Sequence, residues 1–278
     1  DNVAVCGIRG NFDDAQSGVK KIFTDPAEKE KLAAAGYQFS SANSINIGRL
    51  VPQIAYYVWD YTRLLGAAEN EKKDISVNGG VSAAEAISEG EAVNFVVPTG
   101  NFGNILAAYY AKELGVPVHR LICASNSNKV LYDFFRTGEY DRNREFVLTT
   151  SPSMDILISS NLERLIYHIA GDSAEADAGF MKKLSEEGKY QITDEMCKRL
   201  GDFAGGYADE EETAEEIRER YEKDGYVIDP HTAVASAVYG KYRKETGDAT
   251  RTVIVSTASP FKFETSVMKA LGKPHELP

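Results

Sequence analysis

The chain has 278 residues, 43% of them hydrophobic, which is enough to bury the core of one large α/β domain or of two closely joined ones. Its formal net charge of −11 argues against nucleic acid and anionic membranes as partners, because both repel a negatively charged protein. Cys6, Cys123 and Cys197 are scattered and form no C-x-x-C pair, which favours a reducing, cytoplasmic location. No apolar run is long enough to span a membrane, and no signal peptide opens the chain.

The first part of the chain has one strand pattern followed by several helical patterns. Val3–Cys6 is short and apolar and is predicted to be a strand. Because the chain opens at Asp1 rather than at a methionine, we expect it to be cut from something longer. Helices are predicted over residues 12–23, 28–35 and 47–65. Pro52 is expected near the first turn of the third helix or at a kink. Residues 70–90 are polar and glycine-bearing, which is typical of a loop with a short helix at about 83–88.

The most informative stretch is a strand–loop–helix unit in the middle of the chain. Residues 95–97 have the pattern of a buried strand, and a helical pattern runs over 105–114 and stops at Gly115. Between them, Pro98–Asn104 contains two glycines, which let backbone N–H groups approach a ligand closely. Together with the positive end of the helix dipole, this loop suits a phosphate or a carboxylate. It matches neither G-x-G-x-x-G nor the P-loop, and these residues alone fit an ordinary glycine turn equally well.

Alternation of strands and helices continues, with one interruption. A strand and a helix are predicted over residues 118–124 and 130–137. Residues 152–224 then have helical patterns only, over 160–170, 180–186 and 209–224, the first opened by a capping-box pattern at Ser160 and Glu163. A helix, a strand and a helix follow over residues 231–245, 252–256 and 263–271. The order predicts an α/β fold: a mostly parallel sheet flanked by helices, with a helical insertion.

Two loops are expected at the carboxyl ends of parallel strands, where open α/β sheets bind their ligands. One is the glycine loop, and the other is Ser256–Pro260. A hydroxyl at Thr257 or Ser259 would meet a ligand whose phosphate lies on Gly100–Asn104. The alternative is that these hydroxyls cap the following helix.

A third polar cluster precedes the helix predicted at residue 47. Asn43 and Ser44 can orient a carboxylate, and Arg49 can bind a phosphate or carboxylate through two parallel N–H bonds. The alternative is a helix cap followed by a surface arginine.

Other common catalytic patterns are missing from the sequence. The four histidines are not spaced as metal ligands, so no metal site is expected. No G-x-S-x-G occurs, which argues against a hydrolase elbow. His231, at a predicted helix start, is expected to be a partly buried structural residue.

Six segments, in order along nearly the whole chain, resemble the threonine synthases, which are pyridoxal-phosphate (PLP) enzymes of fold type II. They are Gly10–Gln16, Asn43–Asn46 with Arg49, Pro98–Asn104, Met154–Arg164, Asp229–Val234 and Ser256–Phe263. Each is weak alone, but six in family order are specific. One departure is Ser259, which stands where the family has a histidine before the proline.

The resemblance implies fold, cofactor and site together. It implies that the PLP phosphate lies on Gly100, Asn101, Phe102, Gly103 and Asn104, and that Thr257 faces the pyridine nitrogen. It implies that Asn43, Ser44 and Arg49 hold the carboxylate and phosphate of the substrate. The expected reaction converts O-phospho-L-homoserine and water to L-threonine and phosphate, as a step of threonine biosynthesis. Residues 1–60 would be the remainder of a smaller lobe, and residues 61–278 the large PLP-binding domain, with its insertion at about 152–224.

The Schiff-base lysine of the family lies in a Phe-Lys-Asp segment, and no such segment occurs in this chain. The resemblance therefore implies a C-terminal portion of a longer enzyme, inactive by itself, whose lysine is expected upstream of Asp1. Two alternatives stay open: a threonine-synthase-like phospho-lyase or dehydratase, and a non-catalytic protein that binds a phosphorylated metabolite. The expected partner is a small phosphorylated amino acid, with no nucleic acid and no membrane.

Overall fold

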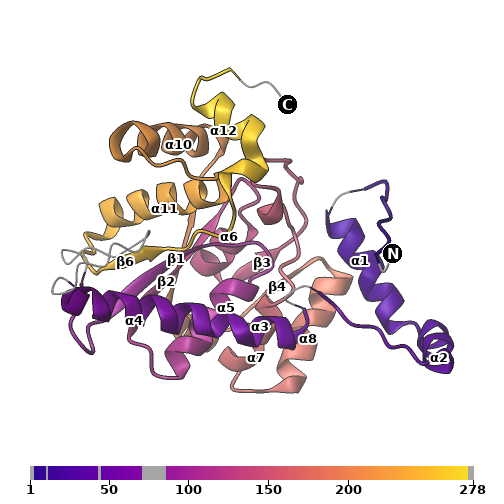
Figure 1. Ribbon diagram of the computed structural model, residues 1–278. Helices are drawn as coiled ribbons and strands as arrows, with labels where there is room; N and C mark the ends of the chain where they lie inside the picture. The colour runs from indigo at the N-terminus through magenta and orange to yellow at the C-terminus, as the bar shows by residue number, and fades with distance from the viewer. Residues whose placement is uncertain (1–2, 11, 43–44, 71–85, 275–278) are drawn as a thin grey trace.

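The computed structural model describes residues 3–10, 12–42, 45–70 and 86–274. Its centre is a parallel four-stranded sheet with the strand order β5-β2-β1-β6. The strands are β1 (Val93–Pro98), β2 (Val118–Ser125), β5 (Phe203–Tyr207) and β6 (Thr252–Ile254). Helices cover both faces of the sheet (Figure 1), so the predicted fold class is confirmed.

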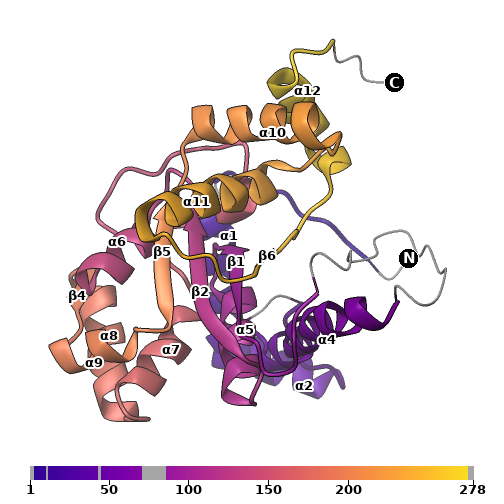
Figure 2. The same ribbon diagram turned by 90° about the vertical axis from the view of Figure 1, so that its left-hand side faces the viewer.

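The helices of the main body form layers on the two faces of the sheet. On one face lie α4 (Ile54–Asn70), α5 (Gly103–Glu113) and α6 (Val130–Thr137). On the other lies α11 (Pro230–Thr246), with α10 (Glu210–Asp224) packed outside it (Figure 2). Phe95, Val96 and Val97 of β1 are completely buried. A strand covered on both faces has a continuous apolar run, which is why this pattern predicted a buried strand.

Most predicted helices are confirmed, and several begin earlier than predicted. The N-terminal helices are α1 (Phe12–Thr24) and α2 (Pro26–Ala34), which lie to one side of the body in Figure 1. The long helix predicted from residue 47 is divided into α3 (Ile47–Leu50), the 3-10 turn η1 (Val51–Gln53) and α4. Pro52 lies in that turn, as expected of a residue that cannot donate a helical hydrogen bond.

Two predictions in the N-terminal half fail or cannot be followed. Val3–Cys6 is not a strand: Val3 and Val5 are 80% and 95% exposed, and no described strand pairs with this segment. An apolar run forms a strand only when another strand supplies hydrogen bonds to it. Of the predicted loop at 70–90, residues 71–85 lie outside the described part, and Ala86–Ser88 is not helical.

The stretch 152–224 differs from the purely helical pattern that the sequence predicts. It contains η3 (Pro152–Met154), α7 (Leu162–Ile169), α8 (Ala174–Glu186), β4 (Lys189–Gln191), α9 (Asp194–Arg199) and α10. It also contributes β5 to the central sheet, while β4 pairs with β3 (Glu139–Asp141) in a small antiparallel ribbon. The division into two lobes stays a prediction.

Helix capping was predicted at the wrong place. The residue before α7 is Asn161, and its side chain makes no capping hydrogen bond, so the Ser160–Glu163 capping box is wrong. A capping box does occur at α10, where Asp209 and Glu212 accept each other's backbone N–H.

The C-terminal elements follow the predicted order. After β6 come the 3-10 turn η4 (Pro260–Phe263) and α12 (Glu264–Ala270). No helix among the described residues is long and apolar enough to cross a membrane.

Candidate functional site

The glycine loop connects the end of β1 to the first turn of α5. Thr99 is held by its backbone N–H, which donates to Ala124 O at 2.8 Å, and by its hydroxyl, which donates to Val97 O at 2.7 Å. A Cβ at Gly100 would lie 2.4 Å from Ser153 O, so only glycine fits there. The first turn of α5 leaves backbone N–H groups without helical acceptors, which suits an anion.

Phe102 fixes the shape of this loop. Its φ of 64° is in the left-handed region, which is unfavourable for a residue with a side chain. Phe102 is only 1% exposed; its ring stacks on Phe135 at 6.0 Å and lies tilted against Phe203 at 5.9 Å. Core packing of the ring therefore holds the backbone of the loop in a strained conformation, of a kind that is concentrated at ligand sites.

A cavity of about 200 Å³ lies at the loop. It is lined by Gln53 and by residues 98–104. Its volume is below the ~300–1,000 Å³ of a pocket for a whole drug-sized ligand. The cavity therefore fits the anionic end of a larger molecule.

The polar lining of this cavity is oriented from α4. The Tyr57 hydroxyl donates to Asn104 Oδ1, which leaves the Asn104 amide nitrogen as the group able to donate to a ligand. Burial, and then the charge of Asp60, raise the pKa of Tyr57 far above its usual value, so the phenol stays protonated and donates.

A second segment, residues 153–161, holds the loop from outside. The Ser159 hydroxyl donates to Gly100 O at 2.8 Å. Asn161 donates to Asn101 O twice, from its backbone N–H at 3.1 Å and from Nδ2 at 2.9 Å. Ser159 and Asn161 are both buried, so the loop is fixed at the backbone oxygens of two successive residues.

Thr257 is brought to the same edge of the sheet as the glycine loop. β6 runs parallel to β1, and the N–H of Val255, the residue directly after β6, donates to Val96 O near the end of β1 at 2.9 Å. Thr257 is exposed there. Ser259 precedes η4 without a side-chain capping bond, which disfavours the capping alternative for its hydroxyl.

Asp229 and His231 connect the start of α11 to Ser153, the residue that packs against Gly100. Asp229 Oδ1 accepts from His231 N and from its Nδ1 at 2.9 and 3.0 Å, while His231 Nε2 accepts from Ser153 N–H at 3.4 Å. These partners assign a neutral imidazole with its proton on Nδ1. Burial would raise the pKa of Asp229, but hydrogen bonds from His231 and Thr232 lower it. His231 was expected to be partly buried, and the structure shows it fully buried.

The substrate segment is only partly described, because Asn43 and Ser44 lie outside the described residues. Arg49 lies in α3 with an exposed side chain, and its carbonyl oxygen accepts from Gln53 Nε2 at 2.8 Å. Since Gln53 also lines the loop cavity, the structure places Arg49 one turn from the candidate phosphate site.

Sequence reasoning missed the residues that support the loop, namely Gln53, Tyr57, Ser153, Ser159 and Asn161. Only Ser153 falls outside the resembling segments and the predicted helix from residue 47, and nothing in its local pattern marks it. Ser159 and Asn161 could have been identified from their place in Met154–Arg164, one of the segments that resemble the family.

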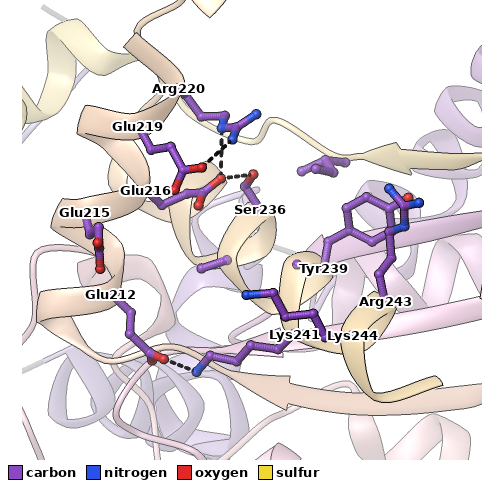
Figure 3. A pocket seen from close by; sticks show the side chains of 13 residues that line it. Glu212, Glu215, Glu216, Glu219, Arg220, Ser236, Tyr239, Lys241, Arg243 and Lys244 are labelled. Atoms are coloured by element: carbon purple, nitrogen blue, oxygen red, sulfur yellow. Dashed lines mark hydrogen bonds and ion pairs between the residues drawn. The ribbon is translucent and has the colours of Figure 1, made fainter. Parts of the chain in front are cut away.

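A larger cavity of about 680 Å³ lies elsewhere, between α10 and α11 (Figure 3). Several of its charged groups are paired: Glu212 pairs with Lys241, and Glu216 pairs with Arg220 and accepts from the Ser236 hydroxyl. None of the predicted site residues lines it. We therefore take the glycine loop as the candidate site.

Comparison with known proteins identifies relatives of the chain. A family model described as threonine synthase, C-terminal, matches residues 232–278. Human threonine synthase-like 1 is 39% identical over 95% of this chain, and threonine synthase of Saccharomyces cerevisiae is 34% identical over 98%. The chain spans about a third (33%) of the first relative's length and about half (51%) of the second's.

Solved structures give the same result. The PLP-bound threonine synthase of Brucella melitensis superposes with a TM-score of 0.75 at 36% identity, over 97% of this chain and 52% of that one. Yeast threonine synthase superposes with the same score at 32% identity, over 97% and 50%. The fold is therefore that of the threonine synthases, and the chain matches the C-terminal portion of these enzymes.

Proposed function

We propose that this chain provides the cofactor-phosphate site of a threonine synthase, which converts O-phospho-L-homoserine and water to L-threonine and phosphate. The observation that carries the proposal is the glycine loop, in which a Cβ at Gly100 has no room and a small cavity opens at the start of α5. Bound PLP supplies the electron sink on which elimination and replacement at the substrate carbons depend.

The residues present fit that cofactor. Backbone N–H groups of Gly100–Asn104 and the Asn104 amide would bind its phosphate. The Thr257 hydroxyl would donate a hydrogen bond to the pyridine nitrogen as a neutral partner, which keeps the ring a moderate electron sink. Arg49, with Asn43 and Ser44, would bind the substrate, and the arginine would stabilise the charge of the phosphate as it leaves.

The anchoring lysine of the family has no counterpart at a Phe-Lys-Asp segment of this chain. We therefore expect the chain alone to bind PLP without a covalent bond and to turn over no substrate. Its ligand would be a small phosphorylated amino acid.

The test is phosphate release from O-phospho-L-homoserine, by this chain alone and mixed with the N-terminal half of yeast threonine synthase. We expect no release from the chain alone, and release of equal amounts of phosphate and threonine from the mixture. A mixture that associates and binds PLP but releases neither product would contradict the proposal.

A second candidate is a threonine-synthase-like phospho-lyase. It stays open because the relative with 39% identity is named threonine synthase-like 1, a name that states no reaction, while yeast threonine synthase is 34% identical. The same assay separates the two candidates, because a phospho-lyase would release phosphate together with a 2-oxo acid instead of threonine.

A further inference from the structure

Arg164, in the first turn of α7, binds two parts of the site that are far apart in sequence. Its Nη2 donates to Ile45 O at 2.8 Å, and its Nη1 donates to Asn161 Oδ1. Ile45 lies next to the proposed substrate residues, at the start of the segment that contains Arg49. One guanidinium therefore connects the substrate segment to the residue that holds the glycine loop.

Asn161 can serve both neighbours in only one orientation. Its Oδ1 accepts from Arg164, while its Nδ2 donates to Asn101 O at 2.9 Å. If the amide were flipped, Nδ2 would face a guanidinium that only donates, and Oδ1 would face a carbonyl that only accepts. The side chain is completely buried, so neither mismatch would be relieved by water.

The segment that carries Asn161 is itself held firmly. The Tyr140 hydroxyl, on β3, donates to Leu157 O at 3.0 Å and accepts from Ser159 N–H at 2.8 Å. Tyr140 is 1% exposed and stacks on Tyr190 of β4 at 5.4 Å. The segment between the glycine loop and Arg164 is therefore fixed to a buried side chain of the core.

We propose that Arg164 and Asn161 form a relay that positions the substrate segment, residues 45–49, according to whether the glycine loop is filled. Both are positioning residues, because their hydrogen bonds reach the loop and the segment rather than a reacting atom. The identity of the ligand, PLP, rests on the proposed function; the mechanical connection does not.

The test is hydrogen–deuterium exchange of the full chain with and without PLP, together with a PLP titration. In the original sequence we expect PLP to slow exchange in peptides covering residues 99–104 and also in those covering 45–50. In R164M the slowing at 45–50 is lost while that at 99–104 remains, and the Kd for PLP rises about tenfold. R164K does not restore the coupling, because a single ammonium lacks the planar fork that reaches two acceptors.

Two further variants locate the effect. N161D keeps an acceptor for Arg164 but removes the side-chain donor to Asn101 O, leaving only the backbone N–H of residue 161 bonded to that oxygen, so it should lose the same coupling. R199M is the matched control, because Arg199 donates to Ile169 O at 3.1 Å at the other end of α7. It should keep the coupling, with a Tm close to that of R164M.

The outcomes are distinct. Slowing at 45–50 that persists in R164M or in N161D would overturn the relay. If the original chain binds no PLP, the proposed function fails, and the relay is then decided without ligand: R164M and N161D must both speed exchange at 45–50. If hydrogen exchange at residues 45–50 in these two variants equals that in R199M, the relay is overturned.

Discussion

At the scale of single residues, Gly100 is the most direct probe of the candidate site. In G100A the new Cβ would lie 2.4 Å from Ser153 O, so the loop or residue 153 must move. We expect a loss of about 1–3 kcal/mol in the free energy of unfolding, as for overpacked sites, and at least tenfold weaker PLP binding. Urea denaturation and a PLP titration measure the two effects.

The matched control for G100A is G179A, in α8, where a Cβ meets nothing within 4 Å. Alanine inside a helix is favoured over glycine by about 0.5–1 kcal/mol, so this variant should be slightly more stable and bind PLP normally. Normal PLP binding by G100A would show that the loop does not hold the cofactor.

Asp177, in α8, gives a residue-scale prediction about pH. Its Oδ1 is buried without a hydrogen-bond partner among the described residues, and burial, with the charge of Glu163, raises the pKa of this carboxyl to about 6. A raised folded-state pKa contributes stability below the unfolded value of 3.8, and that contribution is lost as pH rises through about 6.

D177N should therefore be more stable than the original chain at pH 7 and lose that advantage by pH 4. Because the group is half-exposed and screened by solvent, we expect a gain of no more than about 1 kcal/mol. Urea midpoints measured across this range test the sign, and an advantage for D177N that grows on acidification would contradict it.

At the scale of elements, Asp248 joins the amino ends of two sheet strands to α11. Its Oδ2 accepts from Asn94 Nδ2 of β1 at 2.9 Å and from the Tyr242 hydroxyl of α11 at 2.7 Å. Its Oδ1 accepts from Thr250 N–H at 2.8 Å, two residues before β6 begins. Burial would raise the pKa of Asp248, but these hydrogen bonds lower it well below its usual value.

D248N should lower the free energy of unfolding by about 2 kcal/mol at pH 7, the scale of hydrogen bonds to a charged group. Because a lowered folded-state pKa contributes stability that is lost as pH falls below about 4, the difference should shrink at pH 3. D224N is the control, since the Asp224–Arg220 pair is exposed and worth little. An equal effect of both variants would refute the role of Asp248.

Helices and strands could be predicted where the residues of the element itself carry a complete sequence pattern. The helix at 130–137 was predicted with the bounds that the structure gives, because an apolar face and a terminal Gly138 mark it. The three-residue strands β3 and β4 were missed, since they are too short for a pattern and exist through pairing with each other. Val3–Cys6 failed for the opposite reason: it has the pattern of a strand and no described partner.

At the scale of the whole molecule, the alternation of strands and helices was enough to predict a mostly parallel sheet, but not the strand order. β5 joins the sheet from within the stretch that was predicted to be helical. This strand was not predicted because Phe203–Tyr207 contains two glycines and little apolar pattern. Those glycines are required by packing: a Cβ at Gly206 would lie 2.4 Å from Val238 Cγ1 of α11. A local pattern does not contain that contact.

The candidate site, like the fold, could be predicted only in part from local sequence patterns. The glycine loop and Thr257 were identified from motifs, and the sheet explains why they share an edge. The supports of the loop come from positions far apart in the chain: Tyr57 is 47 residues from Asn104, and Asn161 is 60 residues from Asn101. Contacts over such separations depend on the tertiary fold, so they could be found only in the structure.

The measurement that tests the central claim most directly is a PLP titration of the purified chain, followed by visible absorption before and after borohydride reduction and by mass spectrometry. We expect saturable binding that inorganic phosphate displaces, that G100A weakens at least tenfold, and that leaves the mass of the chain unchanged after reduction. No saturable binding would contradict the claim that the loop holds the cofactor's phosphate. A stoichiometric mass increase fixed on one lysine would contradict the claim that this chain lacks the anchoring lysine.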